Sequence, residues 1–255
     1  MRAMFCFNIT RVSTIDQDFQ LGYPCLLYGI FRMNPKNLKY PFRWKDRKPY
    51  LSDKVFYVPD YYTAHGEWPF PGWEELFGNT NPVAIEYCSG NGLWIIDKAR
   101  QFPEKNWVAV EWQFERARKI WSKMKNEDLT NMLIVAGEAV TLTREYIPKE
   151  SVGSVYVNFP DPWPKEKHAK NRLFQAPFID QLARILKPQG TVIVATDDEV
   201  YSTQIGEKLG QNLLFQSKFK TPGYVTDWPD YGESYFEALW KSQGKTIHYF
   251  QFERL

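Results

Sequence analysis

One carboxylate in this 255-residue chain lies between two prolines and is followed by clustered cations. Asp161 belongs to the run Asn-Phe-Pro-Asp-Pro-Trp-Pro at residues 158–164. Proline fixes its own backbone torsion and restricts the residue before it, so we expect Asp161 on a stiff, extended loop. Four of residues 165–172 are Lys or Arg, which suits an RNA backbone, although a solvated loop is the alternative. The candidate backbone contacts are Lys167, His168, Lys170 and Arg172.

A glycine-containing turn earlier in the chain is typical of a nucleotide site. Glu86 ends an apolar run, and Ser89, Gly90 and Gly92 follow just before a helical pattern. Glycine lets the backbone approach a ligand closely, and the free N–H groups of a helix start hold carboxylate or phosphate. The third small residue of a dinucleotide fingerprint is replaced by Ile95, which argues against NAD or FAD.

Two further acids follow the next two predicted strands. Glu111 lies 25 residues after Glu86, where such folds place the acid that accepts both ribose hydroxyls. Glu138 follows the third strand and would lie along the adenine edge. Together the three acids favour S-adenosylmethionine, because its sulfonium and amine are cationic. Each acid alone could instead be a solvated strand end or a helix-start charge.

The elements that must position these residues follow a regular alternation from Pro82 onward. Short runs rich in Val, Ile and aromatics predict buried parallel strands, and the stretches between them have helical spacing. Right-handed crossovers then give an α/β fold, a doubly wound and mostly parallel sheet with its cleft at the carboxyl ends of the strands. We expect strands over 83–87, 107–110, 132–136, 152–158 and 191–196, and helices over 93–102, 114–124, 142–146, 174–186 and 199–214. A helix over 233–243 and an antiparallel strand over 246–252 close the domain.

The first 80 residues have a different character. They contain 18 of the 43 aromatic residues, and eight of the seventeen prolines lie at or before Pro82. Such proline density predicts an irregular extension with short elements over 1–80, ahead of the main domain at 81–255. Residues 36–54 carry seven Lys or Arg against two Asp, with aromatics interleaved. This composition suits RNA phosphates and stacked bases, or equally a solvated loop packed on the main domain.

Composition narrows the class of protein further. Hydrophobic residues at 44% and charged residues at 24% are ordinary globular fractions, and a net charge of +2 leaves nucleic-acid binding to local patches. Cys6, Cys25 and Cys88 form no CxxC pair, so we expect neither a disulfide framework nor a metal site. We find no apolar run near the roughly 18 residues of a membrane span and no signal-peptide pattern, which predicts a cytoplasmic protein. The sequence does not indicate an oligomeric state.

The Phe-Pro-Asp-Pro-Trp loop and the cations after it resemble those of the bacterial tRNA guanine-N7 methyltransferases. The segments 195–197 (Ala-Thr-Asp) and 234–237 (Ser-Tyr-Phe-Glu) are similar to further motifs of that family. The resemblance covers about residues 83–255 and implies a Rossmann-like, class I methyltransferase domain. It also implies that a methyl group passes from S-adenosylmethionine to N7 of a tRNA guanosine, the variable-loop guanosine at position 46.

The resemblance also implies roles for single residues. Asp161 would be the catalytic candidate, gripping guanine through N1–H and the amino group. N7 carries a lone pair and no proton, so alignment replaces a general base, with donor and acceptor about 3–3.5 Å apart. Cofactor contacts would be Glu86, Ser89, Gly90, Gly92, Glu111, Glu138 and Asp161. Contacts to the target nucleotide would be Lys165, Asp197, Ser234, Tyr235, Phe236 and Glu237.

Departures from the family pattern leave alternatives open. Cys88 stands where the family usually has Gly, and Asn171 stands where it has one of two Arg residues. Asp197 could instead cap the helix that follows it, and Glu237 could be a solvated helix residue. The chain could also methylate another RNA or a small molecule, or be an RNA-binding module without activity on the same fold.

Overall fold

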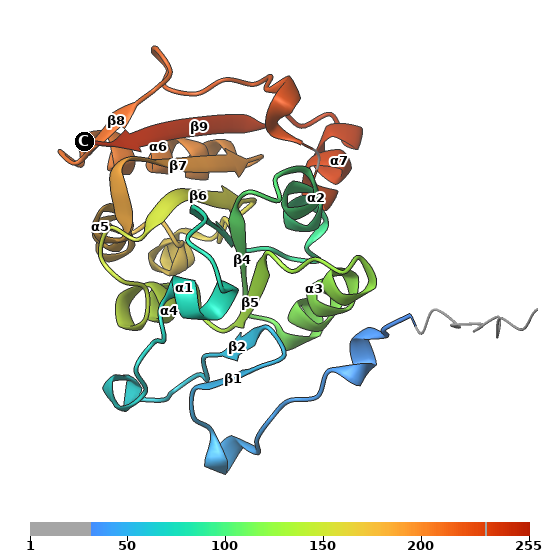
Figure 1. Cartoon of the computed structure of the whole chain (residues 1–255). Coiled ribbons are helices and arrows are strands. Elements are labelled where there is room, and N and C mark those ends of the chain that lie inside the picture. The colour runs from blue at the N-terminus through green and yellow to red at the C-terminus, as the bar shows by residue number, and fades with distance from the viewer. Residues whose placement is uncertain (1–31, 233) are drawn as a thin grey trace, which may run out of the picture. The chain divides into compact units, whose positions relative to one another are not determined.

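The computed structural model describes residues 32–232 and 234–255, and these residues form one nine-stranded sheet with helices on both faces (Figure 1). The strand order is β1-β2-β5-β4-β3-β6-β7-β9-β8. The strands are β1 (Tyr50–Ser52), β2 (Val55–Tyr57), β3 (Val83–Tyr87), β4 (Asn106–Glu111), β5 (Met132–Ala136), β6 (Val152–Asn158), β7 (Leu186–Thr196), β8 (Phe215–Ser217) and β9 (His248–Arg254). Cys6 and Cys25 lie outside the described residues, and Cys88 carries a free thiol.

The centre of the sheet is parallel and the edges are antiparallel. Strands β2, β5, β4, β3, β6 and β7 run parallel in that order. Strand β9 pairs antiparallel with β7 and β8, and β1 pairs antiparallel with β2. Every residue of β3, β4 and β5 is buried, as expected of strands covered on both faces. The predicted doubly wound sheet and its antiparallel closing strand are therefore confirmed.

Helices cover the two faces of the sheet. They are α1 (Trp73–Phe77), α2 (Leu93–Gln101), α3 (Phe114–Asn126), α4 (Ala139–Glu145), α5 (Ala176–Ile185), α6 (Glu199–Gln211) and α7 (Tyr235–Ser242). Buried side chains of α4, α5 and α6 share one hydrophobic cluster, while those of α2 and α3 belong to a second. None of the helices within residues 32–232 and 234–255 has the length and apolar composition of a membrane span.

Helix ends differ from the predicted ones where tertiary contacts override the pattern. The helix predicted over 199–214 ends at Gln211, because the chain turns there toward β8 and leaves Leu213 91% exposed. The helix predicted over 174–186 ends at Ile185, and Leu186 is the first residue of β7. Residue 233, where another helix was predicted to begin, is outside the described residues, and α7 begins at Tyr235.

Part of the N-terminal extension is built into the sheet. Strands β1 and β2 form a hairpin, and β2 lies parallel to β5 with Val55 opposite Ile134. All three residues of β2 are buried. The chain then continues past the carboxyl end of β5, where the Val58 N–H donates to the Ala136 carbonyl at 3.0 Å. The extension therefore reaches the edge of the sheet at which the ligand cleft was predicted.

Gly137 allows this close approach, and an alanine there should destabilise the protein. A Cβ atom at Gly137 would lie 2.6 Å from the Val58 Cβ and 2.7 Å from the Val58 carbonyl oxygen. We expect Gly137→Ala to lower the free energy of unfolding in urea by about 1–3 kcal/mol, as overpacked sites do. Gly66→Ala is the control, because nothing lies within 4 Å of its Cβ position. Equal losses in the two variants would contradict the close contact.

Candidate active site

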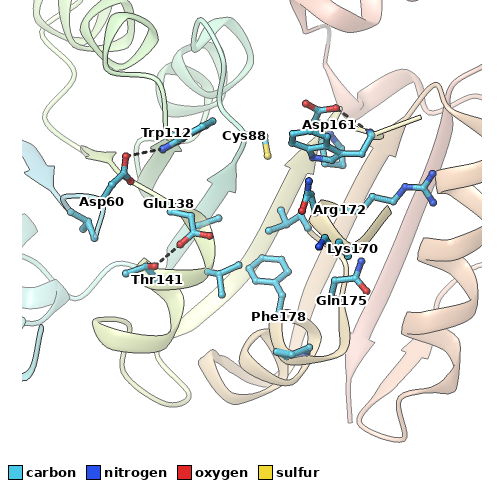
Figure 2. A pocket seen from close by; sticks show the side chains of 18 of the residues that line it. Asp60, Cys88, Trp112, Glu138, Thr141, Asp161, Lys170, Arg172, Gln175 and Phe178 are labelled. Atoms are coloured by element: carbon cyan, nitrogen blue, oxygen red, sulfur yellow. Dashed lines mark hydrogen bonds between the residues drawn. The ribbon is translucent and has the colours of Figure 1, made fainter. Parts of the chain in front are cut away.

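A cleft of about 770 Å³ opens where the parallel strands end. Its walls are formed by residues that follow β2, β3, β4, β5 and β6. Figure 2 shows Cys88 between two groups of side chains: Asp60 and Trp112 on one side, and Asp161 and Lys170 on the other. The cleft therefore lies at the edge of the sheet that the strand order predicts for a ligand.

Glu86 is a buried acid at the end of β3 with one oxygen unpaired. The residue is 1% exposed. The Asn158 side chain donates to Glu86 Oε1 at 2.7 Å, and the Tyr231 hydroxyl donates to Asn158 Oδ1. Oε2 is buried and has no hydrogen-bond partner among the described residues. Burial raises the pKa of Glu86 to about 7. A cationic hydrogen-bond donor can pair with this buried carboxylate oxygen.

The glycine turn is stabilised by Glu111. The Gly90 N–H donates to Glu111 Oε2 at 2.8 Å, and the Gln113 N–H donates to Oε1 at 2.8 Å. Gly90 and Gly92 both have positive φ, and a Cβ at Gly92 would lie 2.7 Å from Ile120. Each carboxylate oxygen can accept a further hydrogen bond. Glu111 can therefore hold the turn and still accept a ribose hydroxyl.

Ser89 supports the same turn from inside. It is a buried residue, and its hydroxyl donates to the Glu86 carbonyl oxygen at 2.9 Å. Its N–H donates to the Val110 carbonyl at 3.1 Å, which ties the turn to β4. The hydroxyl is therefore part of the local fold, and the contact predicted between Ser89 and a cofactor stays a prediction.

Cys88 adopts a backbone conformation that favours glycine. Its φ is +60°, a left-handed value that costs a residue with a Cβ roughly 1–2 kcal/mol. This explains why glycine is usual at this position of the resembled family. Burial, together with the Glu111 and Glu86 carboxylates, raises the pKa of the Cys88 thiol to about 12. At neutral pH the cleft therefore contains a neutral thiol, which is a poor nucleophile.

Glu138 and Trp112 line one side of the cleft. Glu138 precedes α4, is exposed, and accepts a hydrogen bond from the Thr141 hydroxyl. Trp112 is 64% exposed, and its indole N–H donates to Asp60 Oδ2 at 3.3 Å. Sequence reasoning missed Trp112, although its place directly after Glu111 was a usable signal.

The Asp161 loop was predicted to be extended, but the structure shows that it is extended only in part. Phe159 and Trp163 have left-handed φ values of +51° and +42°, so the chain turns on both sides of the acid. The Phe159 N–H donates to the Ala195 carbonyl at 2.8 Å, and the Trp163 N–H donates to Asp161 Oδ1 at 3.1 Å. Asp161 is exposed and lines the cleft. These turns, together with the prolines, hold Asp161 at the wall of the cleft.

Arg172 holds this loop and differs from the other predicted RNA contacts. It is a buried residue that donates to the Pro162 carbonyl at 2.7 Å and to Gln204 Oε1 at 2.6 Å. Its guanidinium also lies 5.3 Å from the centre of the Tyr201 ring. These contacts give Arg172 a role in positioning the loop, and its contact with an RNA backbone stays a prediction. The three lysines predicted in the same segment, Lys165, Lys167 and Lys170, are exposed.

His168 lies in the same segment, on the short 3₁₀ helix over Glu166–Asn171. It is half-buried, and its ring packs edge-on against Trp163 with the ring centres 5.8 Å apart. This contact supports the loop, and a contact of His168 with RNA stays a prediction.

The alternative roles considered for Asp197, as a helix cap, and for Glu237, as a solvated helix residue, are both wrong. Asp198, and not Asp197, caps α6 by accepting a hydrogen bond from the Tyr201 N–H at 2.7 Å. Asp197 pairs with Lys245. Glu237 is 4% exposed and therefore not a solvated helix residue.

Glu237 lies in the first turn of α7, and its side chain is buried. Its Oε1 accepts hydrogen bonds from Lys241 at 2.7 Å and from the Tyr249 hydroxyl at 2.6 Å. Its Oε2 is buried with no partner in the described part of the chain. Ser234 caps α7 by accepting the Glu237 N–H at 3.1 Å.

The other residues of this segment point in different directions. Phe236 lies near the glycine turn, 3.6 Å from the Cβ position of Gly90. Tyr235 is 50% exposed. None of the predicted nucleotide contacts in 197 and 234–237 is among the residues that line the large cleft. Their contacts with a target nucleotide stay predictions.

The N-terminal extension contributes residues that sequence reasoning missed. Asp60, Tyr61, Tyr62 and His65 all line the cleft. The buried His65 shares a 2.5 Å hydrogen bond with the hydroxyl of Tyr146, the residue directly after α4, which fixes this wall of the cleft. The available signal was the apolar run 55–58 followed by Pro and Asp, a pattern typical of a buried strand that ends in a turn.

Comparisons with known proteins find similarity to methyltransferases. A family model described as "Putative methyltransferase" matches residues 80–250. A tRNA (guanine-N(7)-)-methyltransferase of Chlamydia caviae is 45% identical over 220 residues, which cover 86% of this chain and 97% of that protein. One of Thermotoga maritima is 34% identical over 173 residues, covering 68% of this chain and 54% of that protein.

A solved structure shows the same fold at low identity. It is a 16S rRNA (adenine(1408)-N(1))-methyltransferase from Catenulisporales acidiphilia, with a TM-score of 0.52 and 14% identity. The match covers 81% of this chain and 97% of that chain, and it shows the fold alone. The family rests on the sequence relatives, which confirm the resemblance seen in the motifs. The chain belongs to the tRNA (guanine-N7-)-methyltransferase family.

Proposed function

We propose that the protein transfers a methyl group from S-adenosylmethionine to N7 of a guanosine in tRNA, the guanosine of the variable loop. The observation that carries this proposal is the exposed Asp161 carboxylate in the same cleft as Glu138 and Cys88, the residue directly before the glycine turn. The identity to relatives named for this reaction supports the choice of substrate. A tRNA substrate also implies a cytoplasmic location.

The acids around the glycine turn fit the methyl donor. S-adenosylmethionine supplies an electrophilic methyl group on a cationic sulfonium. Glu86 Oε2, which is buried and unpaired among the described residues, suits the donor's cationic amine. Glu111 would accept the ribose hydroxyls, while Glu138 and Trp112 flank the position of the adenine. Three carboxylates around this turn disfavour a phosphate ligand.

Asp161 serves the acceptor. Guanine N7 has an in-plane lone pair and no proton, so no residue has to remove a proton before methyl transfer. Asp161 accepts hydrogen bonds from N1–H and the amino group and thereby aligns N7. Positive charge develops on the purine as the bond forms, and the carboxylate stabilises it. The neutral Cys88 thiol stays out of the chemistry.

The RNA-binding side of the cleft is cationic. The exposed Lys165, Lys167 and Lys170 follow the Asp161 loop, and Lys170 lines the cleft itself. Cations so placed bind phosphates beside the flipped or unpaired guanosine. Asp197 and the segment 234–237 complete the predicted set of contacts around the target nucleotide.

The function is tested by incubating the protein with unmodified tRNA transcript and methyl-labelled donor. We expect the label in 7-methylguanosine after digestion to nucleosides. Label in another base would support a different RNA methyltransferase and contradict the proposal. Tight tRNA binding without any label would support an RNA-binding module without activity.

A further inference from the structure

Two large aromatic side chains stand exposed beside the mouth of the cleft. Trp44 is 57% exposed and Tyr61 is 83% exposed. Their ring centres lie 6.0 Å apart at an interplanar angle of 70°. Both come from the segment before residue 80, and neither contributes to the hydrophobic core. We call this pair the Trp44–Tyr61 platform.

Arg47 connects the backbone segments that carry Trp44 and Tyr61. Its guanidinium donates to the Asp60 carbonyl at 3.0 Å and to the Tyr61 carbonyl at 3.1 Å. It also donates to the Trp44 carbonyl at 3.0 Å and lies 4.4 Å from the centre of the Trp44 ring. One residue thus ties the two rings' backbone segments together. The rings are held in place before any ligand binds, which lowers the entropic cost of binding.

The platform is continuous with the cleft. Tyr61 itself lines the cleft, and the neighbouring Asp60 accepts the hydrogen bond from Trp112. In Figure 2, Asp60 and Trp112 lie on the opposite side of Cys88 from Asp161 and Lys170. Tyr61 of the platform and Lys170 of the cationic loop therefore line the same cleft.

The charges around the platform complement a polyanion. Arg43, Lys45 and Lys48 are exposed, and none of them forms an ion pair with a residue of 32–232 or 234–255. Asp46 is the acid among them, while Asp53 is already paired with Lys125. Exposed rings flanked by such cations are the combination that binds single-stranded nucleic acid, with bases on the rings and phosphates on the cations.

We propose that the Trp44–Tyr61 platform stacks an unpaired base of the tRNA next to the target guanosine. This inference rests on the proposed function, because the tRNA is its occupant. The partner is RNA rather than protein because the exposed rings are combined with cations. Stacking on the platform holds the RNA strand across the cleft while Asp161 reads the target base.

The test compares the KM for tRNA of Trp44→Ala, Tyr61→Ala and the double variant. We expect each single change to raise KM about tenfold, as loss of one base–aromatic stack does. For Trp44→Ala, whose side chain does not line the cleft, the kcat at saturating tRNA and the Kd of the methyl donor should stay unchanged. Trp44→Phe and Tyr61→Phe should restore most of the affinity, since they keep a stacking face. Phe102→Ala, at the residue directly after α2 and not among those that line the cleft, is the aromatic control.

Salt dependence separates stacking from charge. The aromatic variants should weaken tRNA binding without changing the slope of log Kd against log salt concentration. Lys45→Ala combined with Lys48→Ala should reduce that slope by about 0.7–0.9 for each phosphate that the variant no longer neutralises. Unchanged KM in both aromatic variants, with normal formation of 7-methylguanosine, would overturn the platform and leave the proposed function intact. A wild-type protein that forms no 7-methylguanosine would overturn the function itself.

Discussion

Asp161→Asn is expected to lower kcat/KM for tRNA methylation by roughly 100-fold or more, the effect of losing a charged group aimed at transition-state charge. Asparagine keeps the oxygen that accepts the Trp163 N–H, so the loop should retain its shape. It loses the negative charge, and its amide presents donors to the donor edge of guanine. The measurement is steady-state methylation of unmodified tRNA, with the urea unfolding curve recorded in parallel.

Glu166→Gln is the matched control for this change. Glu166 is an exposed acid five residues further along the same segment, so the substitution removes one negative charge without touching Asp161. Its kcat/KM should stay within about threefold of wild type, and its free energy of unfolding within about 0.5 kcal/mol. Asp161→Asn turnover as high as that of Glu166→Gln would show that Asp161 does not act on the reacting base.

The central strands could be predicted from the sequence because their signal is local. The runs at 83–87 and 132–136 are short, apolar and bounded by turn residues, and the structure has β3 and β5 at these bounds. A strand buried on both faces needs no particular partner to be recognised. The acids that follow these strands then fall at one edge of the sheet by topology.

Strands β1 and β2 could not be placed in the same way. Val55 pairs with Ile134, far along the chain, so its strand depends on a contact that composition does not encode. Pro49 and Pro59 flank the hairpin and make the segment resemble irregular chain. As a result the walls of the cleft contributed by Asp60 and Tyr61 were not predicted.

Burial of charged side chains was also unreadable from the sequence. Arg172 lies in a cationic run, and only its distant partner Gln204 shows that it supports the loop. Glu237 lies in a segment of helical pattern where a solvated position was one alternative, and its hydrogen bond from Tyr249 places it inside the fold. A run of like residue types predicts one common role for its members. The contacts of each residue show that the members have different roles.

The pH dependence of stability gives Glu86 a measurable signature. Burial raises the pKa of Glu86 from 4.5 to about 7 in the folded protein, so the folded state binds more protons than the unfolded state between these values. The stabilisation is present below pH 4.5 and is lost as pH rises through 7. We therefore expect the wild-type protein to lose up to about 3 kcal/mol relative to Glu86→Gln between pH 4.5 and 8. The measurement is the difference between the urea unfolding free energies of the two proteins across this range.

The same substitution should act in the opposite direction on the methyl donor. Ionised Glu86 attracts the donor's amine, so wild-type affinity should rise by up to about tenfold per pH unit below 7 and then level off. Glutamine keeps the oxygen that accepts from Asn158 but places an amide donor where Oε2 was, and should weaken binding roughly 10- to 100-fold at pH 8 with a flat pH profile. Calorimetric titration with the donor measures both quantities. A variant that is more stable at pH 8 and yet binds the donor more weakly would show that ionised Glu86 destabilises the fold and strengthens donor binding. A variant that binds with wild-type affinity would instead place the cationic amine elsewhere in the cleft.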